Sequence, residues 1–238
     1  MRKFAVLLLA AAGFGLSQAA SAADLGTAPI YRKAPPAPVY TWTGSYIGGF
    51  VGGAFPDKNT TTTYPLALGV LPATYKSDSS FIGGYTGGYN LQLAPNWLIG
   101  YEGETGYLKL KGSAGYPTVP GAFAQTESSG LYSVWSARFG YVADRSLFYV
   151  KGGAALAQFN SVYADGGLYL SSHKYVFGYA AGAGWEYAID PKWSVKAEYL
   201  YLGFDKTFGL GAASTSVSGV HTGKVGVNYK WDWLSLLR

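Results

Sequence analysis

The chain has 238 residues, of which 49% are hydrophobic, only 13% are charged and none is cysteine. The low charge, combined with 17% aromatic residues, excludes an intrinsically disordered chain, and the absence of cysteine excludes a disulfide framework. The formal charge of +5 is too small, and its bases too scattered, to indicate a nucleic-acid partner.

Residues 1–22 have the composition of a secretory signal peptide. Arg2 and Lys3 form its positive start, Phe4 to Leu16 form an apolar core, and Ala20-Ser21-Ala22 supplies the small residues that a signal peptidase requires. The apolar core is shorter than the roughly 18 residues of a membrane helix, and no second apolar run follows it. We therefore expect cleavage after Ala22, which removes two bases and lowers the formal charge from +5 to +3.

Residues 23–43 form a leader that is rich in proline. Proline cannot donate a hydrogen bond to a sheet ladder, so this segment predicts an extended periplasmic linker rather than a strand. An alternative is a spacer in which Arg32 and Lys33 contact lipid head groups or the cell wall. The prolines are Pro29, Pro35, Pro36 and Pro38.

From residue 44 to residue 231 apolar and polar side chains alternate with a period of two, which is typical of strands that have two different faces. Aromatic residues dominate one face, and small residues and isolated charges occupy the other. Clusters of turn-forming residues separate the alternating segments. The pattern predicts eight strands, at about residues 44–55, 81–93, 97–109, 133–141, 148–156, 175–187, 193–201 and 224–231.

The connections between these segments alternate in length. Three are very short turns, at residues 94–96, 143–146 and 189–192, and the others are longer, at about residues 56–79, 110–128, 161–172 and 206–216. Outer-membrane barrels show this asymmetry, with tight periplasmic turns and longer external loops. The sequence therefore predicts an all-β fold, an eight-stranded antiparallel transmembrane β-barrel over residues 44–231, with both termini in the periplasm.

A soluble β-barrel is the structural alternative, and its interior would have to hold the aromatic face. An eight-stranded barrel is just wide enough for ordinary side chains to fill it, so more than a dozen aromatic rings would not fit. Aromatic side chains that point outward instead form a girdle at the membrane interface. The tryptophans that fall beside the short turns, and that we assign to this girdle, are Trp97, Trp185, Trp193 and Trp231.

The opposite face of each strand then lines a narrow lumen, in which acids and bases should pair because an unpaired buried charge is costly. We predict a salt-bridged plug that does not form a wide pore. The alternative is a narrow porin-like channel for small solutes, which would favour a continuous stripe of one sign. The predicted lumen network consists of Glu102, Glu104, Arg138, Lys151, Glu186, Lys196, Glu198 and Lys224.

Three stretches carry a resemblance to a known family: APPAPVYTWTGSYIGG, WSARFGYVADRSLFYVKGGAA and KVGVNYKW. The chain resembles the small outer-membrane barrels of alphaproteobacteria, the outer-membrane immunogenic or surface-antigen family, which are porin-like and related in architecture to the OmpA membrane anchor. The resemblance implies a Gram-negative outer-membrane protein that contributes to envelope integrity. It further implies contacts with outer-membrane lipid and lipopolysaccharide, and with the host or environment through the loops.

The last predicted strand resembles the signal that the barrel-assembly machinery recognises. Its pattern is a polar residue, a glycine and two aromatic residues, here Lys224, Gly226, Tyr229 and Trp231. Family members usually end at the final aromatic residue. This chain departs from that pattern, because a tail of residues 232–238 follows Trp231.

A lipid-modifying enzyme is the third functional alternative, because His173 follows Ser171 and Ser172. Adjacent residues of a strand point to opposite faces, so Ser172 and His173 are badly placed for nucleophilic catalysis. We interpret His173 and His221 as polar aromatic residues at the interface. Two histidines without cysteine do not predict a metal site, and we expect no cofactor, no catalytic residues and no enzyme activity.

Overall fold

The computed structural model describes residues 40–57, 59–63, 71–116, 120–165, 168–204, 206–210, 213–217 and 219–231. The expected signal peptide, residues 23–39 of the leader and the tail after Trp231 lie outside these residues. Within the described ranges, no helix is long and apolar enough to cross a membrane.

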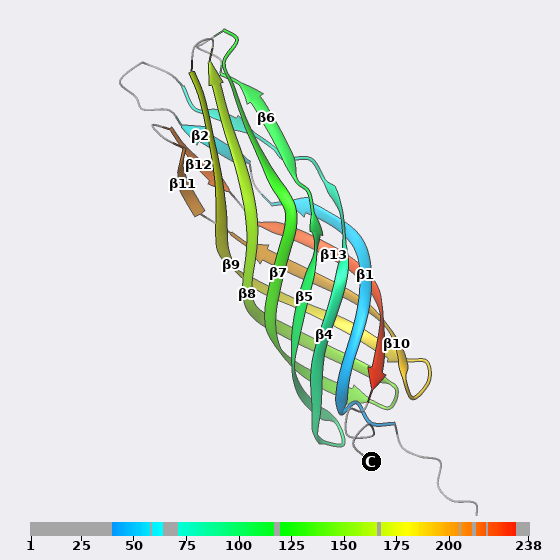
Figure 1. Ribbon diagram of the computed structural model, residues 1–238. Coiled ribbons are helices and arrows are strands. Elements are labelled where there is room, and N and C mark those ends of the chain that lie inside the picture. The colour runs from blue at the N-terminus through cyan, green and yellow to red at the C-terminus, as the bar shows by residue number, and fades with distance from the viewer. Residues whose placement is uncertain are drawn as a thin grey trace, which may run out of the picture. The chain divides into compact units, whose positions relative to one another are not determined.

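Eight of the described strands close into an antiparallel ring (Figure 1). Each strand pairs with the next ring strand along the chain, and the pairing of the first with the last closes the ring, from Ser45 opposite Trp231 to Pro56 opposite Val220. The predicted eight-stranded barrel is thereby confirmed. In ring order the strands are β1 (Gly44–Pro56), β4 (Ser80–Ala94), β5 (Trp97–Leu108), β7 (Phe123–Ala143), β8 (Ser146–Asp165), β9 (Leu168–Ala188), β10 (Trp193–Gly203) and β13 (Val220–Trp231).

The predicted alternation of faces is also confirmed. On β5, 63% of Tyr101 is exposed on the outer wall, whereas only 1% of the next residue, Glu102, is exposed. Glycines let neighbouring backbones approach closely on the inner side. A Cβ atom at Gly52 would collide with the backbone of Gly223 on β13, and one at Gly153 would collide with the backbone of Trp135 on β7.

The three short turns lie at one end of the barrel, where β1 begins and β13 ends (Figure 1). We call this the turn end. Asp144 adopts a positive φ of 55° in the β7–β8 turn. In the β9–β10 turn the carboxylate of Asp190 accepts hydrogen bonds from the backbone N–H groups of Lys192 and Trp193, which lower its pKa.

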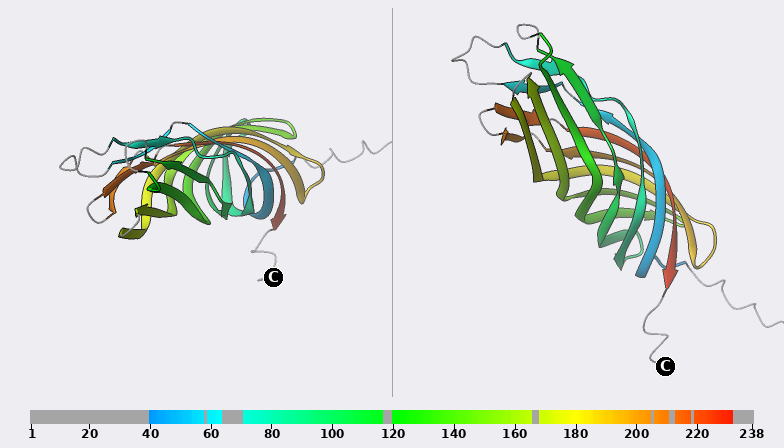
Figure 2. Two further views of the ribbon diagram at one scale, coloured as in Figure 1. Left: turned by 90° about the horizontal axis from the view of Figure 1, so that it is seen from above. Right: turned by 45° about the horizontal axis from the view of Figure 1, so that its top comes forward.

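The opposite end differs from the sequence prediction, because the segments expected as long loops contain further strands. Strands β7, β8 and β9 run 20 or 21 residues and continue past the ring (Figure 2). β6 (Lys111–Gly115) pairs with the extended part of β7. A separate four-stranded sheet contains β11 (Lys206–Leu210), β12 (Ala213–Val217), β2 (Thr60–Thr63) and β3 (Ala73–Tyr75), in that order. We call these added strands, with the extensions of β7–β9, the cap.

The loop prediction was wrong because the alternation of apolar and polar side chains is weak in these segments, as in the run Thr60–Thr63, which carries the same side chain on both faces. Their inner faces meet through hydroxyl groups: Tyr75 lies 2.6 Å from Thr126, and Thr126 lies 3.2 Å from Ser161. Thr62 links to Tyr75 at 3.2 Å and to Thr215 at 3.1 Å. A small apolar cluster packs beside these hydroxyls and consists of Ala73, Tyr75, Tyr116, Ala122, Ala124 and Tyr163.

The interior of the ring is filled in layers. At the turn end lies an apolar cluster that includes Trp42, Leu98, Val142, Leu147, Tyr149 and Ala188. A layer of charged residues lies in the lumen, as described below. Towards the cap, a larger apolar cluster follows, and its large members are Phe50, Ile82, Leu108, Leu110, Tyr132, Phe159, Leu200, Leu202 and Phe204.

Candidate functional site: the lumen charge network

All eight charged residues that the sequence assigned to the lumen point inward, and at most 5% of any of them is exposed. The period of two explains the placement, because Glu102 and Glu104 are two residues apart on β5, as are Lys196 and Glu198 on β10. β7, β8, β9 and β13 supply one charged residue each, namely Arg138, Lys151, Glu186 and Lys224.

Arg138 organises the side of the network nearer the turn end. Its guanidinium lies 3.0 Å from the Glu186 carboxylate and 3.4 Å from that of Glu102. It also donates a 2.7 Å hydrogen bond to the hydroxyl of Tyr46, and its Cζ lies 3.9 Å from the ring centroid of Tyr149. Two carboxylates and an aromatic face therefore hold one buried guanidinium.

Three lysines pair with the carboxylates on the other side, and two of them, Lys151 and Lys224, bridge more than one carboxylate. Lys151 lies 2.7 Å from Glu102 and 2.8 Å from Glu198. Lys224 lies 2.7 Å from Glu104 and 2.8 Å from Glu198, and Lys196 lies 3.1 Å from Glu102. Since Glu102 contacts Arg138 as well, the eight residues form one connected network with four acids and four bases.

Polar side chains that the sequence analysis did not assign to the lumen complete the network. Tyr46, Tyr132 and Tyr149 donate hydrogen bonds of 2.8, 2.6 and 2.8 Å to Glu102, Glu104 and Glu198. Ser194 and Asn228 donate to Glu186 at 2.5 and 2.8 Å. The period of two could have identified these tyrosines. Each lies an odd number of residues from the outward aromatic residues of its own strand and must therefore point to the opposite face.

The network compensates the large cost of burying charge. Each carboxylate has both a cationic partner and a neutral donor, which is the condition under which buried ion pairs are tolerated. One carboxylate oxygen from each of Glu102, Glu104 and Glu198 lies within 4.8 Å of the other two. The ammonium groups of Lys151, Lys196 and Lys224 supply the positive charge that this carboxylate group requires.

A second structural element in the lumen lies in the segment that the sequence predicted to be a linker. Residues Tyr40–Thr43, which we call the entry strap, precede β1, and only 2% of Trp42 is exposed. Its ring packs in the apolar cluster at the turn end. The barrel unit therefore includes residues 40–43, which the sequence analysis assigned to the linker, and it begins no later than Tyr40.

The four girdle tryptophans lie on the outer wall beside the turn end, with 37–46% of each exposed. Trp97 stacks on Phe139 at a centroid distance of 5.2 Å, and Trp193 contacts Tyr229 at 4.9 Å. Trp185 lies 6.1 Å from Tyr187. Such aromatic clusters are typical of a membrane interface.

The residues of the expected assembly signal divide between the two faces of β13. Lys224 points inward into the charge network, whereas Tyr229 and Trp231 lie on the outer wall. Gly226 lies against β1, where a Cβ atom would meet the backbone oxygen of Gly49 at 2.7 Å. The pattern at these positions therefore also satisfies the packing of the closed ring.

The two histidines lie on the outer face in side-chain clusters. His173 Nδ1 lies 2.7 Å from the Asn160 side-chain oxygen. His221 Nδ1 lies 2.6 Å from the Tyr199 hydroxyl, and its Nε2 lies 3.4 Å from Asp57. Ser172 on β9 is opposite Ser161 on β8, and its side chain points to the opposite face of the sheet from that of His173.

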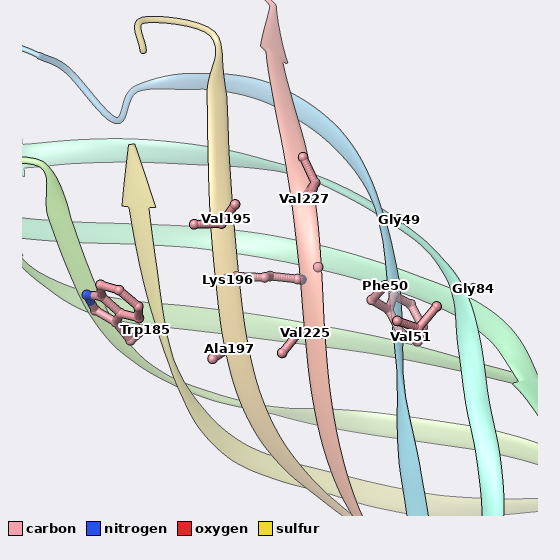
Figure 3. A pocket seen from close by; sticks show the side chains of 11 residues that line it. Gly49, Phe50, Val51, Gly84, Trp185, Val195, Lys196, Ala197, Val225 and Val227 are labelled. Carbon is pink, nitrogen blue, oxygen red and sulfur yellow. The ribbon is translucent and has the colours of Figure 1, made fainter. Parts of the chain in front are cut away.

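A hollow on the outer wall is lined by small side chains of β1, β10 and β13 (Figure 3). Val51, Val225 and Val227 are exposed there, beside Ala197, and Trp185 borders it. Two other lining residues, Phe50 and Lys196, are buried. This hollow belongs to the outward apolar face of the strands and not to the lumen.

Comparisons with known proteins agree with this architecture. Residues 6–231 match the model of the outer membrane protein beta-barrel domain family. Two relatives, each named 31 kDa outer-membrane immunogenic protein, from Brucella melitensis biotype 1 and Brucella suis biovar 1, are 33% identical over 249 residues, which cover 96% of this chain and all of the relative.

Two solved structures support the fold. The outer membrane protein OprG from Pseudomonas aeruginosa is similar with a TM-score of 0.56 and 17% identity, covering 81% of this chain and 98% of that one. The outer membrane protease OmpT from Escherichia coli is similar with a TM-score of 0.51 and 9% identity, covering 82% and 99%. At these identities the likeness concerns the fold alone.

Proposed function

Because the chain belongs to the outer membrane β-barrel domain family and is an outer-membrane protein, we propose that it is a closed structural barrel that contributes to envelope integrity. The turn end lies in the periplasm, and the cap meets the surroundings of the cell. The role is structural, with the cap available for contacts with the host or environment, rather than catalytic.

The filled lumen is the observation that supports this proposal. Charged residues from six of the eight ring strands pair across the centre, and apolar clusters lie on both sides of them. A narrow porin-like channel would need a continuous polar path instead. The network has equal numbers of acids and bases, so it lacks the single sign that attracts an ion into a pore.

The partners we propose follow from the outer surface. The aromatic girdle and the apolar outer wall contact membrane lipid, and the polar cap lies at the level of the lipopolysaccharide sugars. The barrel-assembly machinery inserts the chain through β13. The cap is also the surface available to a host or to other cells, a role consistent with relatives that are named immunogenic.

A deletion strain tests the structural role. Loss of the protein should make cells more sensitive to detergent and to large antibiotics that an intact outer membrane excludes, and the wild-type chain should restore resistance. A matched chain whose cap strands β2 and β3 are replaced by a short turn should restore resistance. It should lose the contacts that the cap makes with a host or with other cells. A deletion strain with unchanged resistance and slower uptake of a small solute would favour the channel.

A further inference from the structure

The entry strap makes contacts around most of the ring although it contains only four residues. Trp42 belongs to one buried apolar cluster with Leu98 of β5, Val142 of β7, Leu147 and Tyr149 of β8, and Ala188 of β9. All of these residues are distant from Trp42 in the sequence. The cluster that buries this one side chain is therefore assembled from four strands of the ring.

Two further strands hold the strap at its edges. On β4, the Gln92 side chain accepts a 3.1 Å hydrogen bond from Trp42 N, and Gln92 N donates a 3.0 Å hydrogen bond to Thr43 Oγ1. On β13, the Lys230 ammonium donates to the Thr41 carbonyl and lies 4.5 Å from the centroid of the Tyr40 ring. The Tyr40 ring packs edge-on against Trp42 at 5.1 Å.

The strap is also continuous with the strand that closes the barrel. β1 begins at Gly44, directly after the strap, and pairs with β13 from Ser45 opposite Trp231 onward. Separation of β1 from β13 would carry the start of β1 away from the lumen, while Trp42 is held among β5, β7, β8 and β9. Movement of the start of β1 away from the lumen therefore requires Trp42 to leave its cluster, and movement of β13 alone breaks the contact between Lys230 and Thr41.

We propose that the entry strap is a latch, which docks only after the ring has closed and then slows its reopening. The site for Trp42 does not exist until the walls that form it have come together, so its contacts form late. Contacts that are absent from the folding transition state lower the unfolding rate and leave the folding rate nearly unchanged. The Trp42 indole N–H is buried without a hydrogen-bond partner among the described residues, so the latch can be released at lower cost than a fully satisfied core residue.

Folding and unfolding kinetics of the full mature chain in lipid vesicles test the latch. The folded and unfolded forms can be followed by their different mobility on unboiled detergent gels. Trp42→Ala should speed unfolding by about tenfold or more and change the folding rate by less than about twofold. Trp193→Ala, a girdle tryptophan on the outer wall at the same end, is the matched control and should affect unfolding much less.

A reversible disulfide lock provides the second measurement. Because the natural chain contains no cysteine, the two introduced cysteines can form only one intramolecular disulfide. A chain with Thr43→Cys and Gln92→Cys should unfold more slowly than the wild type when the disulfide is formed, and at the unlocked rate after reduction. If Trp42→Ala cannot be folded, Trp42→Phe and the lock still give both rates. A folding rate that falls as much as the unfolding rate rises, or a lock without effect on unfolding, would overturn the proposal.

Discussion

Arg138 and Lys151 are direct cross-strand partners on β7 and β8, so two positive charges face each other inside the barrel. Because both side chains are positive, each needs carboxylate partners from other strands to balance its charge. Arg138 reaches Glu102 and Glu186, and Lys151 reaches Glu102, Glu104 and Glu198. The stability of this part of the wall therefore depends on acids that project from other strands.

Glu102 should be the most sensitive position of the network, because it alone contacts Arg138, Lys151 and Lys196. Glu102→Gln keeps the volume but leaves three buried cations short of one negative charge. We expect a loss of roughly 3–5 kcal/mol in the free energy of unfolding, measured by denaturant titration in vesicles. Glu127→Gln, which breaks only the exposed pair with Lys109, is the control and should cost less than about 1 kcal/mol.

Removal of both partners should be less harmful than removal of one. Glu104 and Lys224 contact each other at 2.7 Å, so Glu104→Gln alone leaves Lys224 with less compensation. The double variant Glu104→Gln with Lys224→Met removes the orphan charge. We expect a coupling free energy of about 0.5–3 kcal/mol in a double-mutant cycle, and strict additivity of the two single effects would contradict the pairing.

The sequence was sufficient to predict the ring and the charges inside it, because a membrane imposes a strong contrast between the two faces of each strand. Tyr101 and Glu102 are adjacent, and only one of them can face lipid. That contrast disappears in the cap, where the run Thr60–Thr63 presents the same side chain to both faces. The entry strap was missed for a different reason. Trp42 follows a proline-rich segment, and no local sequence pattern indicates that residues from four distant strands form an apolar cluster around it.

The free-energy cost of placing an arginine on the outer wall should depend on its depth in the membrane. Val225 is 58% exposed midway along the apolar outer face of β13, and Val162 faces outward on the cap extension of β8. Val225→Arg should lower the free energy of unfolding by roughly 2–4 kcal/mol, as expected near the bilayer midplane, whereas Val162→Arg should cost about 1 kcal/mol or less. Equal costs at the two positions would place the cap in the membrane as well.

Cysteine labelling of intact cells should establish which end faces outward. Lys76 lies beyond β3 in the cap, and Lys192 lies in the β9–β10 turn at the turn end. A membrane-impermeant maleimide should label Lys76→Cys on intact cells and label Lys192→Cys only after the outer membrane is permeabilised. The reverse pattern would place the turn end outside the cell and the cap in the periplasm.

Single-channel recording in planar bilayers tests the closed lumen most directly. The wild-type barrel should show no steady conductance, because the paired charges lie between two apolar clusters and Trp42 occupies the turn end. Arg138→Ala should unfold more easily and yet remain closed while it is folded, since the entry strap and the apolar cluster towards the cap are unchanged. Large, steady conductance of the wild type, unaffected by Arg138→Ala, would contradict the closed barrel and identify the protein as a channel.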